Sequence, residues 1–362
     1  MYGGIESMLA TMARHRLSIA PDSMEFALCF DGRIASEIRA EGATVHLLGG
    51  VRARAPWTVL RARRALAQHV DVGVDALICH GTWAQGLFGG VGKSGTTKVF
   101  WMHGPAGGWH WTEWLASRQR PHGVIVNSDY TRQSLEALYQ GVSATIIHPP
   151  VEIRTDDSAK QFRESIRRTI GTAPGSIVIT QVSRLERWKG HECLIRAVSM
   201  LDRSHDWEVW IVGGVQRPSE GAYLTTLEKL TSDLGVSSRV RFLGQRSDVP
   251  LLLRSADIHC QPNIEPEPFG LTFVEALAAG LPVVATAMGG ALDIVTPECG
   301  LLVPPRDEAA LSEALSSLVG DNGLRRRMGS MGPARAQSLC EPEKQLRAIN
   351  EAIRGFRESR AS

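Results

Sequence analysis

Residues 258–285 read IHCQPNIEPEPFGLTFVEALAAGLPVVA, and the order of apolar and turn-forming segments in this stretch decides the class of fold. Two strand-length apolar runs, 258–261 and 282–285, flank a proline-rich loop and a helix-length stretch. We expect the helix to span 271–279, because Gly280 and the proline after it are typical residues beyond a helix end. Strands of this length separated by a helix are typical of parallel sheets covered by helices.

The same alternation continues on both sides of this stretch. Six strands are expected in the first half of the chain, at residues 26–30, 44–48, 76–79, 98–102, 123–126 and 144–147. Six more are expected in the second half, at residues 177–182, 208–212, 240–243, 258–261, 282–285 and 300–303. The 362 residues therefore predict two α/β domains, each with a doubly wound parallel sheet.

A change of pattern between Pro149 and Gly175 marks the domain boundary, because a polar and basic stretch there is bordered by proline and glycine. We place the first domain at residues 1–165 and the second at 166–340. Residues 341–362 follow as an amphipathic helix with no strand after it.

The composition excludes several classes of protein. Forty basic and 38 acidic side chains leave a net charge of +2, so no overall field attracts nucleic acid. The 43% of hydrophobic residues is too high for a disordered chain. The six cysteines have no metal-binding spacing, and no signal-peptide or membrane-spanning run occurs. We expect a soluble protein of the cytoplasm.

The start of the chain departs from the doubly wound pattern. Such a domain opens with a strand whose end leads into a glycine turn and a helix. Here the turn Gly3-Gly4 comes at once and the helix, residues 5–14, follows. We expect that the first strand of the N-terminal domain is missing, and that translation begins upstream of Met1 or the chain was cut there.

Two glutamates in the opening stretch, Glu267 and Glu275, are eight residues apart. Proline and glycine keep Glu267 in the loop, whereas Glu275 lies inside the helix. The amides of Gly270, Leu271 and Thr272 would face outward at the start of that helix, a natural anion site. A carboxylate beside an anion site is explained if Glu267 meets the hydroxyl groups of a sugar.

Two cations lie in the connection that follows the strand 177–182. Arg184 offers a planar fork of donors and Lys189 a compact charge, and together with a helix N-terminus they suit a diphosphate. Both groups of residues follow strands of one sheet, so a ligand is expected in the crevice at the carboxyl ends of the strands.

These residues resemble those of glycosyltransferase family 4, retaining enzymes of the GT-B fold that use nucleotide sugars. The resemblance rests on the Glu267–Glu275 block, on Arg184 with Lys189, on residues 239–244 and, more weakly, on 126–128 and 3–6. It implies two Rossmann-like domains that face a central cleft, the first binding the acceptor and the second the nucleotide-sugar donor. It also implies that the last helix crosses back to the N-terminal domain.

The resemblance also implies a role for each matching residue. Arg184 and Lys189 would hold the donor diphosphate, Glu275 the ribose, and Glu267 the transferred sugar. His103 would end a strand of the first domain and face the sugar, so that Glu267 and His103 are the expected catalytic residues. The remaining donor-binding residues implied are Gly4, Leu243, Gly244, Pro268, Phe269, Gly270, Leu271 and Thr272.

The chemistry of sugar transfer is consistent with these roles. Breaking the anomeric C–O bond gathers negative charge on the diphosphate, which preorganised cations and amides stabilise. No Asp-x-Asp motif occurs, so we expect Arg184 and Lys189 to act in place of a metal, without a cofactor. The expected function is transfer of a sugar from a nucleotide sugar to a glycan or lipid-linked acceptor, in bacterial polysaccharide or cell-envelope synthesis. Retention is implied by the resemblance.

Three other functions stay open. Paired carboxylates also occur in glycoside hydrolases, although those enzymes need no cations at a leaving diphosphate. A nucleotide-sugar 2-epimerase shares the two-domain shape but needs acid and base groups that we do not identify. An inactive donor-binding or partner subunit would be consistent with the missing first strand.

Two surface features have both a structural and a functional interpretation. Trp109, Trp111 and Trp114 follow His103; we expect core packing for at least one of them, and the others could stack on an acceptor sugar. In residues 56–70, Trp57, Arg61 and Arg64 share the face opposite the apolar stripe. We favour a solvated face, and the alternative is contact with an anionic membrane leaflet.

Overall fold

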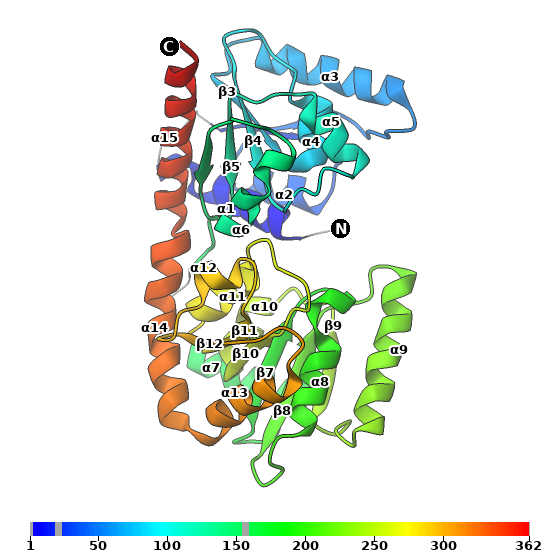
Figure 1. Cartoon of the computed structure of the whole chain (residues 1–362), viewed down its shortest axis with the longest axis vertical. Coiled ribbons are helices and arrows are strands. Elements are labelled where there is room, and N and C mark those ends of the chain that lie inside the picture. Colours follow the sequence, from blue (N-terminus) through cyan, green and yellow to red (C-terminus); the bar gives the residue numbers. More distant parts are fainter. Residues whose placement is uncertain (1–2, 19–23, 154–158, 362) are drawn as a thin grey trace. The chain divides into compact units, whose positions relative to one another are not determined.

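The computed structural model describes residues 3–18, 24–153 and 159–361, and they form two compact units (Figure 1). Unit 1 contains the chain up to residue 152 and again from residue 340, and unit 2 contains residues 153–339. Both units are built on parallel strands, which confirms the α/β class. Among the described residues, no helix has the length and apolar character needed to cross a membrane.

Unit 2 has one six-stranded parallel sheet in the order β12-β11-β10-β7-β8-β9. The strands are β7 (Ile177–Val182), β8 (Trp207–Val212), β9 (Val240–Gly244), β10 (Ile258–Gln261), β11 (Val283–Thr286) and β12 (Gly300–Val303). The helices are α7 (Ala159–Ile170), the 3₁₀ turn η3 (Arg187–Lys189), α8 (His191–Ser199), α9 (Pro218–Asp233), α10 (Val249–Ser255), α11 (Leu271–Ala278), α12 (Ala291–Ile294), α13 (Glu308–Gly320) and α14 (Asn322–Cys340). The first strand, β7, lies centrally between β10 and β8, which is the doubly wound arrangement.

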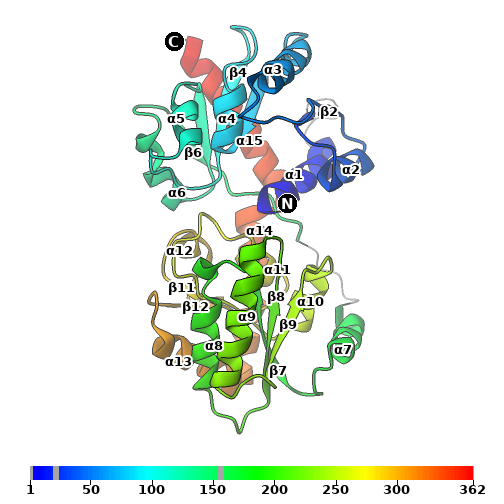
Figure 2. The same ribbon diagram turned by 90° about the vertical axis from the view of Figure 1, so that its right-hand side faces the viewer.

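Helices cover both faces of this sheet. On one face α8 and α9 lie side by side, and with α13 they share an apolar cluster with the strands (Figure 2). On the other face α10 contacts α7, α11 and β7. The helix predicted after residue 270 is α11, and Asp307 caps α13 by accepting a hydrogen bond from the amide of Ala310 at 2.8 Å. The helix that we expected at 271–279 is therefore confirmed.

Unit 1 has two parallel sheets, β1-β2 and β3-β4-β5-β6. The strands are β1 (Phe26–Leu28), β2 (Val45–Leu47), β3 (Ala76–His80), β4 (Thr97–Met102), β5 (Gly123–Val126) and β6 (Ala144–Ile146). The helices are α1 (Gly4–His15), η1 (Arg16–Ser18), α2 (Arg33–Ala40), α3 (Pro56–Val70), α4 (Gly81–Phe88), α5 (Trp111–Ser117), α6 (Asp129–Gln133), η2 (Leu135–Ala137) and α15 (Pro342–Ala361). All twelve predicted strands are present, within a few residues of their expected bounds.

The two sheets of unit 1 are separate where a doubly wound sheet would be continuous. In the strand order of unit 2, the first strand lies between the second and the fourth. The corresponding neighbours in unit 1 are β1 and β3, and no strand in the described ranges joins them.

An apolar cluster of α1 and α15 holds unit 1 together. Met8 of α1 and Leu346 of α15 are buried in the same cluster as Trp101 of β4. Gly123 of β5 lies beneath Phe356 of α15, where a Cβ atom would approach the ring to 2.2 Å. Only glycine therefore permits this close contact between helix and strand.

The division of the chain differs from the boundary that we placed at residue 165, because the whole of α7 belongs to unit 2. Arg163 donates to Oδ1 of Asp257 at 2.6 Å, and Arg167 donates to Oδ2. Arg167 is buried and also donates to the carbonyl of Ser255 at 2.9 Å. These bonds fasten α7 to the segment before β10, a contact between distant residues that local sequence pattern does not reveal.

Candidate functional site

The loops at the carboxyl edge of the unit 2 sheet carry most of the predicted site residues. Because the strands are parallel, the loops after β7, β9, β10 and β11 all leave from this edge. The loop after β7 contains Arg184 and Lys189. The loop after β10 contains Glu267 and leads into α11, and Gly244 ends β9.

Lys189 and Glu267 form an ion pair. Nζ of Lys189 lies 2.5 Å from Oε2 of Glu267, and the two side chains are only 11% and 14% exposed. Burial lowers the pKa of Lys189, while the charge of Glu267 opposes that shift. The ammonium group also lies 3.8 Å from the ring centre of Trp188. The site therefore holds an ammonium group, balanced by one carboxylate, in a poorly solvated place where its interaction with a charged ligand would be strong.

Two amides hold the same carboxylate oxygen in place. Asn263 donates from Nδ2 to Oε2 of Glu267 at 2.9 Å, and Gln261 donates from Nε2 at 3.3 Å. Thr272 in turn donates to Oε1 of Gln261 at 3.2 Å, which ties the start of α11 to this network. Sequence analysis did not assign a role to Asn263 or Gln261, although both lie between a strand end and Glu267.

Glycines let the loops approach one another closely. Gly190, between η3 and α8, has φ 74°, and a Cβ atom there would lie 1.8 Å from the carbonyl oxygen of Pro262. After β11, the amide of Gly290 donates to the carbonyl of Glu267 at 2.7 Å. A Cβ atom at Gly290 would lie 2.2 Å from the carbonyl oxygen of Phe269. The backbone contacts that these glycines permit position Lys189 and Glu267.

The predicted turn 268–272 lies at the N-terminus of α11. Gly270 precedes the helix in the left-handed region with φ 107°, and Leu271 and Thr272 are its first residues. Phe269 is buried, at 3% exposure. The first amides of a helix have no partner within the helix, so this end of α11 suits an anion next to Glu267.

Glu275 lies one turn into α11 and is half-buried. In the described part of the chain its carboxylate has no hydrogen-bond or ion-pair partner. Burial raises the pKa of Glu275 to about 7. A half-buried carboxylate without a protein partner is available to a hydroxyl-bearing ligand.

Arg184 is more exposed than Lys189 and pairs elsewhere. Its Nη1 lies 3.0 Å from Oε1 of Glu186, and its side chain is 42% exposed. Its positive charge contributes to the lowered pKa of Lys189, after the larger effect of burial. The two cations are therefore near each other, but Arg184 makes no direct contact with Glu267 in the hydrogen bonds and ion pairs of the described residues.

The end of β9 lies beside the end of β8. Gly244 has φ 65°, and its carbonyl accepts a hydrogen bond from the amide of Gly213 at 3.0 Å. Leu243 precedes it at the same edge of the sheet. The side chain of Arg241, earlier in β9, donates to Oε2 of Glu208 at 2.7 Å and to the carbonyl of Gly171 at 2.7 Å.

In unit 1, His103 follows β4 and pairs with a second histidine. Nε2 of His103 lies 3.0 Å from Nδ1 of His80, at the end of β3. Both rings stack with Trp101, and Asn127 donates to the carbonyl of His103 at 3.0 Å. Burial lowers the pKa of His80 to about 4 and the pKa of His103 well below its usual value. Both rings are therefore neutral, and one of the two facing nitrogens donates its N–H to the other. His80 was not predicted, because a lone histidine has no pattern around it.

Two further sequence predictions fall in unit 1. Gly4 is the first residue of α1 and is exposed. The expectation that at least one indole near His103 belongs to the core is wrong: Trp109, Trp111 and Trp114 are 95%, 48% and 55% exposed. Across the described ranges, no cluster of three or more His, Cys, Asp or Glu side chains is arranged to hold a metal ion.

Two family models match the chain. Residues 162–335 match the model described as glycosyl transferases group 1, and residues 2–155 match the model described as glycosyltransferase family 4. The GDP-mannose-dependent monoacylated alpha-(1-6)-phosphatidylinositol monomannoside mannosyltransferase of Corynebacterium glutamicum is 31% identical over 70% of this chain and 69% of its own length. The chain belongs to this family of glycosyltransferases, as its motifs predict.

Other relatives match a shorter stretch. The D-inositol 3-phosphate glycosyltransferase of Corynebacterium jeikeium is 36% identical over 59% of this chain, and the match spans 52% of the relative's length. The chain thus spans about half of that relative.

Solved structures support the fold. The HepE protein of Anabaena, crystallised with UDP-glucose, has a TM-score of 0.83 at 23% identity, with 98% of this chain and 97% of that chain covered. A glycosyltransferase of Rickettsia africae has a TM-score of 0.82 at 20% identity, with 98% and 95% covered. These similarities confirm the expected GT-B fold class.

Proposed function

We propose that this protein transfers a sugar from a nucleotide sugar to a glycan or lipid-linked acceptor, with retention of the anomeric configuration, in bacterial polysaccharide or cell-envelope synthesis. The observation that carries the proposal is the buried Lys189–Glu267 pair beside the N-terminus of α11. Relatives named for inositol phosphate and phosphatidylinositol mannoside support a polyol or lipid-linked acceptor.

In this proposal the donor diphosphate competes with Glu267 for Lys189. Its oxygens bind Nζ of Lys189, the guanidinium of Arg184 and the first amides of α11, and these groups act in place of a metal or other cofactor. Glu267 is then released toward the hydroxyls of the transferred sugar, still oriented by Asn263. Preorganised positive groups stabilise the leaving diphosphate more than the intact donor, and each such donor typically contributes about 10²–10³ in rate.

The other donor contacts that we propose are those that the family resemblance implies. Glu275 binds the ribose hydroxyls with its unpaired carboxylate, and Leu243 and Gly244 approach the base. The family resemblance assigns His103 to the sugar and Gly4 to donor binding. The anomeric C–O bond to the diphosphate breaks while the acceptor oxygen attacks from the same face. The acceptor's proton passes to the leaving phosphate oxygen.

We further propose that the protein works in the cytoplasm and contacts the inner leaflet of the membrane from one side, without binding nucleic acid. The six cysteines are free thiols, as expected in a reducing compartment. A lipid-linked acceptor would also be reached at the leaflet surface.

The test is to incubate the purified protein with UDP-, GDP- and ADP-sugars and sugar or polyol acceptors, and to analyse products by mass spectrometry and anomeric NMR. We expect one donor to give a product with retained configuration. Arg184→Ala with Lys189→Ala should lower turnover by at least about 10²-fold. The control, Arg168→Ala with Lys229→Ala, replaces two exposed cations of unit 2 and should leave turnover unchanged.

Two results would contradict the proposal. One is a nucleotide sugar isomerised without acceptor, which indicates an epimerase. The other is turnover of the Arg184/Lys189 variant within a few-fold of wild type.

A further inference from the structure

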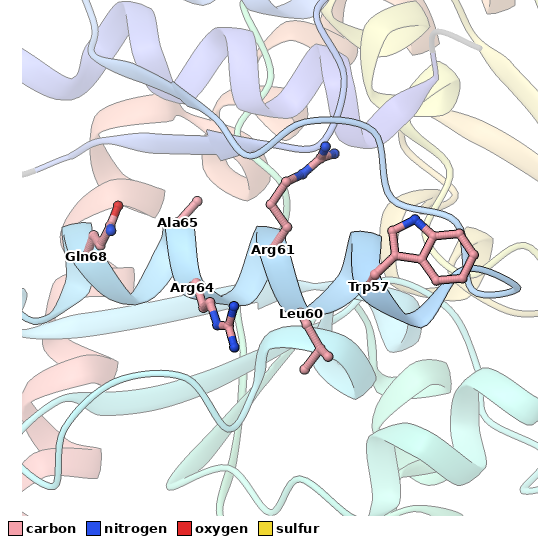
Figure 3. Close-up of a pocket in the computed structure, with 6 residues that line it drawn as sticks. All are labelled: Trp57, Leu60, Arg61, Arg64, Ala65 and Gln68. Atoms are coloured by element: carbon pink, nitrogen blue, oxygen red, sulfur yellow. The ribbon is translucent and has the colours of Figure 1, made fainter.

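Helix α3 (Pro56–Val70) presents a stripe of exposed side chains that the proposed reaction does not use. Trp57 and Leu60 are 70% and 55% exposed, although tryptophan and leucine normally bury most of their surface. Arg61 and Arg64 are exposed on the same stripe, and Gln68 continues it. Figure 3 shows these side chains along the length of the helix, from Trp57 near its start to Gln68 near its end. We call Trp57, Leu60, Arg61, Arg64 and Gln68 the α3 stripe.

The opposite side of α3 explains why the stripe is exposed. Ala62, Leu66 and Val70 are buried in one apolar cluster with Phe88 of α4. Residues three or four apart share a helix face, so the helix is fixed by that buried face and its stripe faces away from the cluster. Packing within unit 1 therefore accounts for the buried face but not for Trp57 and Leu60.

The charge around the stripe has one sign. Residues 42–70 contain five arginines and no aspartate or glutamate. Arg52 and Arg54, in the loop before α3, are exposed, as are Arg61 and Arg64. The whole chain has a net charge of only +2, so this segment is a local concentration of positive charge.

We propose that the α3 stripe docks on an anionic lipid surface. This inference rests on the proposed function, because it names the surface that makes the proposed membrane contact. A helix with arginines and an exposed Trp–Leu pair on one stripe matches a membrane interface, where anionic headgroups meet the apolar boundary. The stripe borders a shallow hollow of about 360 Å³, which a headgroup can enter beside Arg61 and Arg64.

Other partners fit the stripe less well. A second copy of the chain docked through the same surface would bring arginines against arginines, which repel. A nucleic acid would meet the arginines, but Leu60 offers nothing to a phosphate backbone or to a base stack. A lipid surface uses the arginines, the indole and the leucine together.

The test is co-sedimentation of the full chain with vesicles of phosphatidylcholine plus phosphatidylglycerol, and with vesicles of phosphatidylcholine alone. We expect binding to the anionic vesicles that is lost in high salt and is at least about tenfold weaker on neutral ones. Arg54→Glu with Arg64→Glu should weaken binding by at least about tenfold. We choose these two because Arg61 also donates to the carbonyl of Gly50 at 3.3 Å and its loss could disturb the loop.

Trp57→Ala should weaken binding without changing the charge, which distinguishes docking from simple attraction. The matched control, Arg326→Glu with Arg327→Glu, reverses two exposed arginines of α14 and should bind as wild type does. The proposal is overturned if the Arg54/Arg64 variant binds as the control does, or if the wild type retains single-stranded RNA but not anionic vesicles.

Turnover on a water-soluble acceptor, measured without vesicles, should be the same for all four proteins. Failed docking with normal turnover therefore rejects the α3 stripe alone, whereas absent turnover with normal docking rejects the proposed reaction.

Discussion

At the scale of single residues, the site combines one carboxylate that three side chains hold with one that has no partner in the described residues. Glu267 accepts hydrogen bonds from a lysine and two amides, whereas Glu275, one turn into α11, has no partner in the described residues. A protein without a ligand gains no stability from an unpaired, half-buried carboxylate. A ligand that binds the carboxylate of Glu275 would explain why the carboxylate is there. The folding stability that is lost by leaving it unpaired should be measurable.

Glu275→Gln should stabilise the protein at pH 8. The pKa of Glu275 is about 7 in the folded state, above its usual value of 4.5, so the folded chain binds the extra proton and loses stability as pH rises from 4.5 through 7. Glutamine removes that loss, and we expect a gain of about 1 kcal/mol, or about 2–4 °C in melting temperature. At pH 4 the two proteins should melt together. A gain of equal size at both pH values would contradict the account.

Asn263→Asp tests how Glu267 is oriented. The new carboxylate would face Oε2 of Glu267 in place of an amide that donates at 2.9 Å. Two carboxylates at this distance share a proton at low pH and repel when both are ionised. We expect turnover of the variant to fall as pH rises from about 5 to about 8 relative to wild type. Asn263→Ala, which adds no charge, should lower turnover without that pH dependence; identical pH profiles for the two variants would reject the orienting role.

At the scale of elements, the site depends on backbone contacts between the loops that follow β7 and β10. Gly190→Ala should disrupt them, because a Cβ atom there meets the carbonyl of Pro262 at 1.8 Å and the residue has φ 74°. Gly175→Ala is the matched control, since Gly175 has φ 88° with no atom within 4 Å of its Cβ position. Left-handed strain alone typically costs about 1–2 kcal/mol. Thermal unfolding should show a larger loss for Gly190→Ala, and equal losses would mean that the loops do not need this contact.

The elements themselves could be predicted because their signals are local. Apolar runs of strand length, and the glycine that follows α11, lie within a few residues of what they determine. The Glu267–Glu275 spacing is equally local, and it pointed to the loop and helix that carry the proposed site. Asn263 and His80 could not be identified, since each acts through a partner that the fold brings near. The position of α7 in unit 2 was missed for the same reason, because Asp257 is about 90 residues from the arginines that bind it.

At the scale of the whole molecule, the two units contain different parts of the proposed function. Unit 2 has a continuous six-stranded sheet and the charged site at its carboxyl edge. Unit 1 has the neutral His80–His103 pair, three exposed indoles and the α3 stripe. The near-zero net charge of the chain conceals these local concentrations of charge, so the formal charge of +2 is a poor guide to what the protein binds.

The central claim is that Lys189, released from Glu267, holds the donor diphosphate. Titration calorimetry tests it most directly, with the nucleotide sugar that best raises the melting temperature of the wild type. Because hydrogen bonds to charged groups contribute about 1.5–3 kcal/mol, Lys189→Ala should weaken donor binding by about 10- to 100-fold. Lys229→Ala, an exposed lysine of α9, should bind as tightly as wild type. Equal dissociation constants for the Lys189 and Lys229 variants would contradict the account.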